Sequence, residues 1–205
     1  MIALIENNIL ARLEAAGTAN VLGYKFGTMQ AYPEDWDEHL VSAEVTFPSA
    51  YAKFVSFDAD SQLRSGARVK ATFGLVVAAK SQRNKTAARQ GFMPSNPDAP
   101  AEPGSMQLME DAIGLLQRQQ LGLDIAPFEL LAGQAPELSD KLIKAGVSVM
   151  AMQWQTSFIF QLALPIPGVD GRALGDFATF DTQWDVPPFD GVTDLETTVT
   201  LPQET

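Results

Sequence analysis

Side chains that commonly carry out chemistry are few in this chain. The 205-residue sequence holds one histidine, His39, and no cysteine. A catalytic triad or a two-histidine metal site needs more than one imidazole. The absence of cysteine excludes disulfides, thiolate catalysis and cysteine-based zinc sites. We therefore interpret His39 as an exposed residue of a surface loop.

Acidic residues cluster around His39 and offer oxygen atoms that suit calcium: Glu34, Asp35, Asp37 and Glu38. Their spacing lacks the EF-hand pattern. No glycine-rich phosphate loop and no GxGxxG motif occurs, and the other paired carboxylates lie in stretches expected to be solvated. The sequence therefore predicts a protein that is not an enzyme, with no catalytic residue, cofactor or metal.

Charge is distributed unevenly along the chain, whose formal net charge is −11. Residues 64–89 hold seven basic and no acidic residues, whereas 163–205 hold eight acidic residues and only Arg172. Blocks of opposite sign predict charged contacts between subunits or with partners. The alternative for each block is a solvated surface. The basic residues that we expect at such an interface are Arg68, Lys70, Lys80, Arg83, Lys85 and Arg89.

Hydrophobic periodicity predicts several elements in the first half. These are a helix over 2–16 ended by Gly17, one or two short strands within 21–33, a surface loop over 33–39, a half-buried strand over 41–47, an extended segment over 50–57 and a strand over 67–79. In the last, Val69, Ala71, Phe73, Leu75 and Val77 share an apolar face. The opposite face carries Arg68 and Lys70, so we expect it to meet water or a partner.

A long connection over 80–104 leads to a central helix that begins at 105. Ser105 is expected to cap this helix and Gly122 to close it in a left-handed conformation. A buried run after Phe128, a short helix over 137–145 and a strand over 147–160 follow. This pattern predicts an α+β fold, with a mixed or antiparallel sheet packed by the N-terminal helix and the central helix.

The chain changes character near residue 163. Residues 1–162 are expected to form the α+β domain, and 163–205 an extended acidic C-terminal arm rich in turn formers. Four aromatic residues of this arm are expected to anchor it on a neighbouring subunit or partner: Phe177, Phe180, Trp184 and Phe189. A tail folded on its own domain, or a final hairpin over 177–201, is the alternative. No apolar run approaches the ~20 residues of a membrane span, and the N-terminus is not expected to be a signal peptide.

Five segments give the chain a family resemblance: MIALIENNILARLEAAG, FPSAYAKFVSF, ARVKATFGLVVAAKSQRNKTAARQG, PGSMQLMEDAIGLLQRQQLGLDIAPFELL and VSVMAMQWQTSFIF. In this order the sequence resembles the tail terminator proteins of Mu-like phages and prophages, over roughly residues 1–160. The most specific part is the loop over 89–91 followed by the helix and LGLDIAPFE. The segment 163–205 has no counterpart in the resemblance.

The resemblance implies a virion structural protein with no enzymatic activity. Such proteins form a six-fold ring that caps the completed tail tube at its head-proximal end. The implied partners are other copies of the chain, the tail tube protein, the head–tail connector or neck protein and, in contractile tails, the sheath protein. DNA would only pass through the lumen, no membrane is involved, and assembly takes place in the host cytoplasm.

Two alternatives stay open. The first is another head–tail connector or neck protein of the same class. The second is a nucleic-acid- or ligand-binding module that uses the basic segment 64–89. Phe73 falls on the apolar face of its strand, so no aromatic platform for bases is evident in this segment, and an acidic protein repels a polyanion at long range.

Overall fold

A computed structural model describes residues 1–63, 66–92, 102–161, 179–184 and 195–200. The chain divides into two compact units, residues 1–162 and 163–205. The first unit combines helices with a five-stranded sheet, which confirms the predicted α+β class. The second contains the antiparallel strands β6 (Thr179–Trp184) and β7 (Leu195–Thr200).

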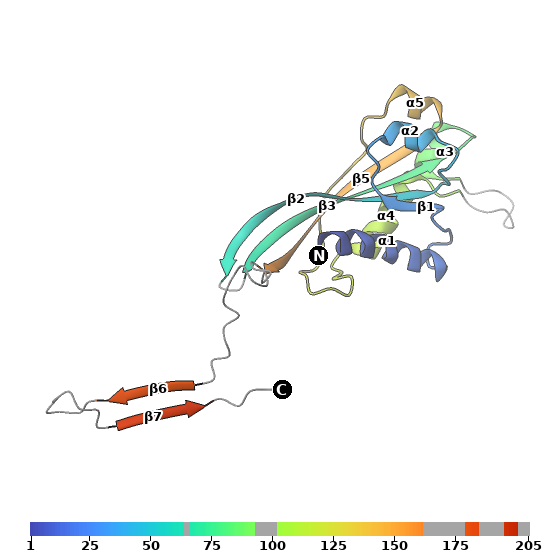
Figure 1. Cartoon of the computed structure of the whole chain (residues 1–205). Helices are drawn as coiled ribbons and strands as arrows, with labels where there is room; N and C mark the ends of the chain where they lie inside the picture. The colour runs from blue at the N-terminus through green and yellow to red at the C-terminus, as the bar shows by residue number, and fades with distance from the viewer. Residues whose placement is uncertain (64–65, 93–101, 162–178, 185–194, 201–205) are drawn as a thin grey trace. The chain divides into compact units, whose positions relative to one another are not determined.

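The elements of the first unit are shown in Figure 1. The helices are α1 (Ile2–Thr18), α2 (Trp36–Val41), α3 (Lys85–Gln90), α4 (Ser105–Leu116) and α5 (Asp140–Lys144). The strands are β1 (Thr28–Ala31), β2 (Ser49–Leu63), β3 (Gly66–Lys80), β4 (Glu129–Gln134) and β5 (Val147–Gln161).

The sheet is mixed and has the order β1-β2-β3-β5-β4. Strand β1 pairs parallel to β2, and all other neighbours pair antiparallel. Strands β2, β3 and β5 are each 15 residues long, so each spans about 50 Å at ~3.3 Å per residue. The three long strands form the centre of the sheet.

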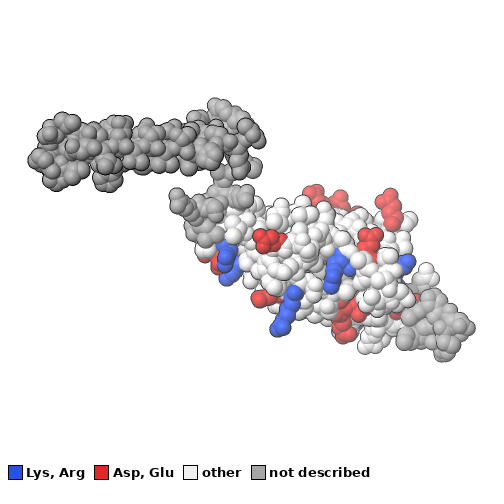
Figure 2. All heavy atoms as spheres, turned by 90° about the horizontal axis from the view of Figure 1, so that it is seen from below, with Lys and Arg blue, Asp and Glu red and all other residues white. Residues whose placement is uncertain are grey.

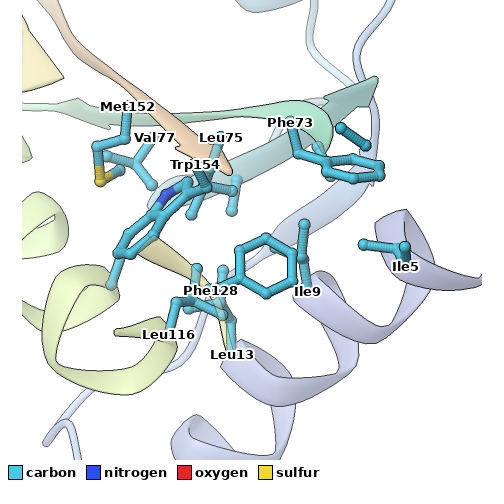
Figure 3. Packing of buried hydrophobic residues seen from close by; sticks show 14 of the residues in the cluster. Ile5, Ile9, Leu13, Phe73, Leu75, Val77, Leu116, Phe128, Met152 and Trp154 are labelled. Atoms are coloured by element: carbon cyan, nitrogen blue, oxygen red, sulfur yellow. The ribbon is translucent and has the colours of Figure 1, made fainter. Parts of the chain in front are cut away.

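Helices α1 and α4 cover one face of the sheet and enclose the main core (Figures 1 and 3). The residues predicted to share the apolar face of β3 are all buried there, which confirms that prediction. From β5, Trp154 is fully buried in the same cluster. Figure 3 shows the α1 side chains Ile5, Ile9 and Leu13 pointing toward the side chains of the strands.

Helices α2 and α5 pack on part of the opposite face. Their buried residues Leu40 and Leu142 join Tyr51, Ala78 and Val149 in a second hydrophobic cluster. Because neighbouring residues of a strand point to opposite faces, Val77 belongs to the first cluster and Ala78 to the second. The part of the sheet that contributes to both clusters therefore lies between two layers of helices.

Three predictions for the N-terminal third are wrong. Helix α1 continues through Gly17, which is buried beside Lys25, and ends at Thr18. The predicted strand over 41–47 is absent because Val41 still belongs to α2, and no strand follows until Ser49. The predicted surface loop over 33–39 is partly α2. Its polar residues, which suggested a loop, lie in this helix and in the segment before it. The prediction of one or two short strands within 21–33 is confirmed by β1.

The central helix is shorter than predicted and differently capped. It ends at Leu116, and although Gly122 is left-handed with φ +71°, it lies in the following loop. The Ser105 hydroxyl makes no cap; it lies 2.8 Å from the Ser148 hydroxyl, and Gly104 occupies the N-cap position. The buried face of Leu108, Ala112 and Leu116 agrees with the predicted spacing.

Two further segments depart from the prediction. The run after Phe128 forms the edge strand β4, which is mostly exposed and not buried. Within the connection 80–104, α3 forms, and Phe92 and Glu102 exchange backbone hydrogen bonds of 2.8 and 3.0 Å. This pairing closes the base of the loop between them.

The two edges of the sheet differ in protection. Strand β1 covers only residues 49–52 of β2. Just beyond it, the Glu6 carboxylate accepts a hydrogen bond from the Phe54 N–H, and β2 then shifts register at two places. Such bulges and charges discourage pairing with another strand. On the other edge, the Gln117 side chain accepts from the Leu130 N–H, and Leu131 is half exposed.

The three tyrosines should ionise at unusually high pH. Burial raises the pKa of Tyr24, Tyr32 and Tyr51, and Tyr24 also donates a 2.9 Å hydrogen bond to the Asp111 carboxylate, whose charge raises its pKa further. Above pH ~10 the unfolded chain releases phenolic protons that the folded protein retains, so the free energy of unfolding should fall as pH rises. Phenolate absorbance and urea unfolding between pH 8 and 12 would measure both effects.

The Tyr24→Phe variant is the control for this prediction. It removes the tyrosine with the largest shift, so its stability should depend less on pH above ~10 than that of the natural chain. Equal pH dependence of the two proteins would show that Tyr24 is not protected.

Candidate interaction surfaces

The predicted interface residues of β3 lie on the sheet face opposite α1 and α4. Arg68 and Lys70 are exposed there, as the alternation predicted. The Lys70 ammonium lies 3.1 Å from the Asp60 carboxylate. An exposed pair of this kind contributes at most ~1 kcal/mol to stability, so both side chains remain accessible to a partner.

The other four predicted basic residues follow one another in sequence from the end of β3 to α3. Lys80 ends β3, and its ammonium lies 5.7 Å from the centre of the Phe47 ring. The Arg83 guanidinium stacks on Phe92 at 4.0 Å and its Nε lies 3.4 Å from the Glu102 carboxylate. Arg83 thus has a structural role at the base of the loop that follows α3.

Lys85 and Arg89 belong to α3 itself. The Asn84 side chain begins this helix by accepting a 2.7 Å hydrogen bond from the Ala87 N–H. Both basic side chains are exposed, in contrast to Ala87 and Ala88, which are buried. Of the predicted set, these two offer charge at the surface with the least involvement in the fold.

The six basic residues do not form one patch. Lys80 follows Lys70 by ten positions along β3, a distance of about 33 Å in an extended strand. On the face seen in Figure 2, Lys and Arg side chains lie singly among acidic ones. The single basic surface expected from the sequence is therefore two separate groups, and their role as an interface stays a prediction.

The aromatic residues predicted to anchor the C-terminal segment are only partly placed. Phe177 and Phe189 lie outside the described residues. Phe180 and Trp184 belong to β6, where the backbone pairs them with Val199 and Leu195 of β7. This pairing corresponds to the hairpin that the sequence left open as an alternative, and a role in anchoring stays a prediction.

His39 does not lie in a loop, contrary to the prediction. It lies in α2, half-buried, with Nε2 3.2 Å from the Tyr51 hydroxyl and 3.1 Å from the Gln30 side-chain nitrogen. These contacts join α2 to β1 and β2. Among the described residues, no group of three His, Asp or Glu side chains is arranged to hold a metal ion.

Sequence reasoning missed two hollows. The first, of about 710 Å³, lies between α1 and the loop after α4, and both Arg12 and Arg118 line it. The second, of about 220 Å³, lies between α2 and α5 and includes Tyr32 and Trp36. Arg12 and Arg118 are 106 positions apart in the printed sequence, and no local motif signals that the fold brings them together.

The long strands expose apolar side chains near residues 57 and 160, where they extend beyond the helices. We call this part of the sheet its distal end. Phe57 is 49% exposed and Phe160 is 37% exposed, with ring centres 6.0 Å apart. Ile159, next in sequence, is 48% exposed on the other face. The sequence placed Phe160 on an apolar face but gave no sign that the helices leave this end uncovered.

A comparison with known families identifies the first unit. A sequence model for the family described as "Bacteriophage Mu, Gp37" matches residues 1–159. The chain belongs to this family. The match confirms the expected relation to Mu-like phages, and it covers the five helices described in the first unit and its sheet except the last two residues of β5. A search of curated proteins found no match.

Membership of the Mu Gp37 family indicates a bacteriophage structural or morphogenesis protein, associated with the virion. The family match ends before the second unit, at residue 159. In the described part of the chain, no helix has the length and apolarity needed to cross a membrane.

Proposed function

We propose that this protein is a tail terminator, which forms a ring on the completed tail tube and presents the joining surface for the head connector or neck. The ring is a hexamer, located at the head-proximal end of the tail and assembled in the host cytoplasm. Its partners are other copies of the chain, the tail tube protein, the neck protein and, in a contractile tail, the sheath protein. The protein acts by assembly and not by catalysis, and DNA passes through its lumen.

The observation that carries this proposal is the uncovered distal end of the sheet in a member of the Mu Gp37 family. Phe57, Phe160 and Ile159 expose large apolar side chains where α1, α4, α2 and α5 do not reach. Clusters of exposed large apolar residues commonly mark protein–protein contacts. Large apolar side chains exposed on both faces of this end suit a subunit that touches several neighbours.

The nucleic-acid-binding alternative has less support from the geometry. The basic segment is divided between two places, and Lys70 and Arg83 already pair with carboxylates. Another neck protein of the same structural class is the alternative that the exposed end fits equally well. Behaviour toward tail tubes separates these functions.

Light scattering of the full chain tests the proposal, with and without purified tail tubes and over a range of salt concentrations. We expect a discrete closed oligomer, alone or on the tubes. A Phe57→Ser, Phe160→Ser variant should lose this assembly while remaining folded, because both rings are substantially exposed. Val21→Ser, at a residue 71% exposed, is the matched control. A monomer that ignores tubes at every salt concentration would overturn the proposal.

A further inference from the structure

The first unit carries two hollows that differ in charge, because arginines line one and acidic residues line the other. We propose that these two surfaces contact each other between neighbouring copies of this chain. The hollow between α2 and α5 receives arginine side chains, and the hollow beside α1 supplies them. This inference rests on the proposed ring and specifies one of its contacts.

The hollow between α2 and α5 has the chemistry of a guanidinium site. Tyr32 and Trp36 stack with ring centres 4.6 Å apart, and Asp37 and Glu137 also line the cavity. The Lys53 ammonium already lies 4.8 Å from the centre of the Tyr32 ring. Aromatic faces beside carboxylates favour arginine, whose planar group stacks and forms paired hydrogen bonds.

The hollow beside α1 presents two arginines and no acidic residue. Its lining consists of Asn8, Ala11, Arg12, Arg118, Gln119, Gln120, Leu121, Gly122 and Leu123. Neither Arg12 nor Arg118 forms a salt bridge within the described part of the chain. Acidic residues are absent from this lining, although the protein has a net charge of −11.

The backbone holds Arg118 in a defined position. Its φ of +60° lies in the left-handed region, which non-glycine residues rarely adopt. The Arg118 N–H donates to the Phe128 carbonyl at 2.9 Å, and Asn8 donates to the Leu121 carbonyl at 3.0 Å. Such strained, well-held residues are often found at functional sites. The Arg118 backbone is therefore well held, and its exposed side chain lies in the lining of the hollow.

The two hollows lie on opposite faces of the sheet. The loop that carries Arg118 packs through Leu121 and Ile125 on the core beneath α1 and α4, whereas Trp36 packs on the cluster beneath α2 and α5 (Figure 1). One copy cannot bring its own two hollows together. Contact between unlike surfaces of successive copies closes into a ring when the rotation from one copy to the next allows it.

Charge reversal tests the contact in the full-length protein, with oligomer dissociation measured by light scattering and sedimentation, alone and on tail tubes. Arg12→Glu with Arg118→Glu should weaken association about tenfold or more, and so should Asp37→Arg with Glu137→Arg. Combining all four substitutions restores opposite charges and the natural net charge. Association should then recover, which also shows that the reversed residues do not prevent folding.

Lys25→Glu with Lys144→Glu is the control for net charge. Both lysines are exposed and line neither hollow, so this variant should associate as the natural chain does, apart from general repulsion. Association unchanged by both reversals, or not recovered in the four-fold variant, would overturn the contact while leaving the ring intact. Reversed variants that form rings but fail to join tails would assign the hollows to another partner. A natural chain that never associates would overturn the ring itself.

Discussion

Phe128→Ala should lower the free energy of unfolding by about 3–5 kcal/mol, the usual cost of deleting a buried aromatic ring. Phe128 is fully buried, with its ring centre 6.1 Å from that of Phe73 and 6.4 Å from that of Trp154. It also fixes the preceding loop: its carbonyl accepts from the Arg118 N–H, and its own N–H donates to the Gln119 carbonyl, both at 2.9 Å. The cavity left by alanine lies between the sheet and this loop.

Urea unfolding followed by tryptophan fluorescence measures the loss. Phe57→Ala is the matched control, because the same ring is removed from a position that is 49% exposed. Its cost should be well below that of Phe128→Ala, since partly exposed rings lose less on truncation. Similar losses at the two positions would show that the core is not centred where the structure places it.

Gly104→Ala should destabilise the protein by about 1–3 kcal/mol or more, as overpacking does at a site that cannot relax. A Cβ at Gly104 would lie 2.1 Å from the Gly91 nitrogen and 2.6 Å from the Arg89 carbonyl oxygen. Because these are backbone atoms, the end of α3 and the start of α4 would have to separate. The φ of −86° at Gly104 is accessible to alanine, so the effect comes from crowding and not from backbone strain.

Gly114→Ala, inside α4, should have the opposite effect on stability. No atom lies within 4 Å of the Cβ position at Gly114, and alanine is favoured over glycine inside a helix by about 0.5–1 kcal/mol. This variant should therefore be more stable than the natural chain. Thermal unfolding of both variants gives the comparison, and a Gly104→Ala protein as stable as Gly114→Ala would contradict the close approach of α3 and α4.

The parts of the fold that were predictable from sequence are those with long, regular hydrophobic patterns. Strand β3 alternates from Val69 to Val77, and the buried stripe of α1 follows steps of three and four residues, so both were located correctly. In β5, Trp154 and Phe158 are likewise on the predicted face. Each of these patterns extends for many residues, and chance alternation over such a length is rare.

Short segments were misread because tertiary contacts determine them. The alternation of Val41, Val45 and Phe47 resembles a strand, but Val41 closes α2 and the rest packs irregularly against Tyr51. The sequence signal for a cap at Ser105 was real, but Ser148 competes for its hydroxyl. Ser148 is 43 positions from Ser105, so no local pattern reveals this competition.

The candidate surfaces were less predictable than the fold. A run of basic residues is visible in the sequence, yet β3 carries its members to opposite ends of a long strand. Arg12 and Arg118 are each isolated in sequence, so no local pattern indicates that they share a surface. The left-handed conformation at Arg118 is not predictable from a glycine at that position. Contacts between distant segments create these surfaces, so local patterns do not reveal them.

The unequal edges of the five-stranded sheet have a consequence for how copies of this chain can pair by their strands. A fibril that grows by pairing sheets edge to edge needs two open edges on every molecule. Here the Glu6 carboxylate and two bulges obstruct the β2 side, while the β4 side stays accessible from Leu131 onward. A strand that pairs with β4 therefore finds no equally open edge on the β2 side of the five-stranded sheet from which growth could continue.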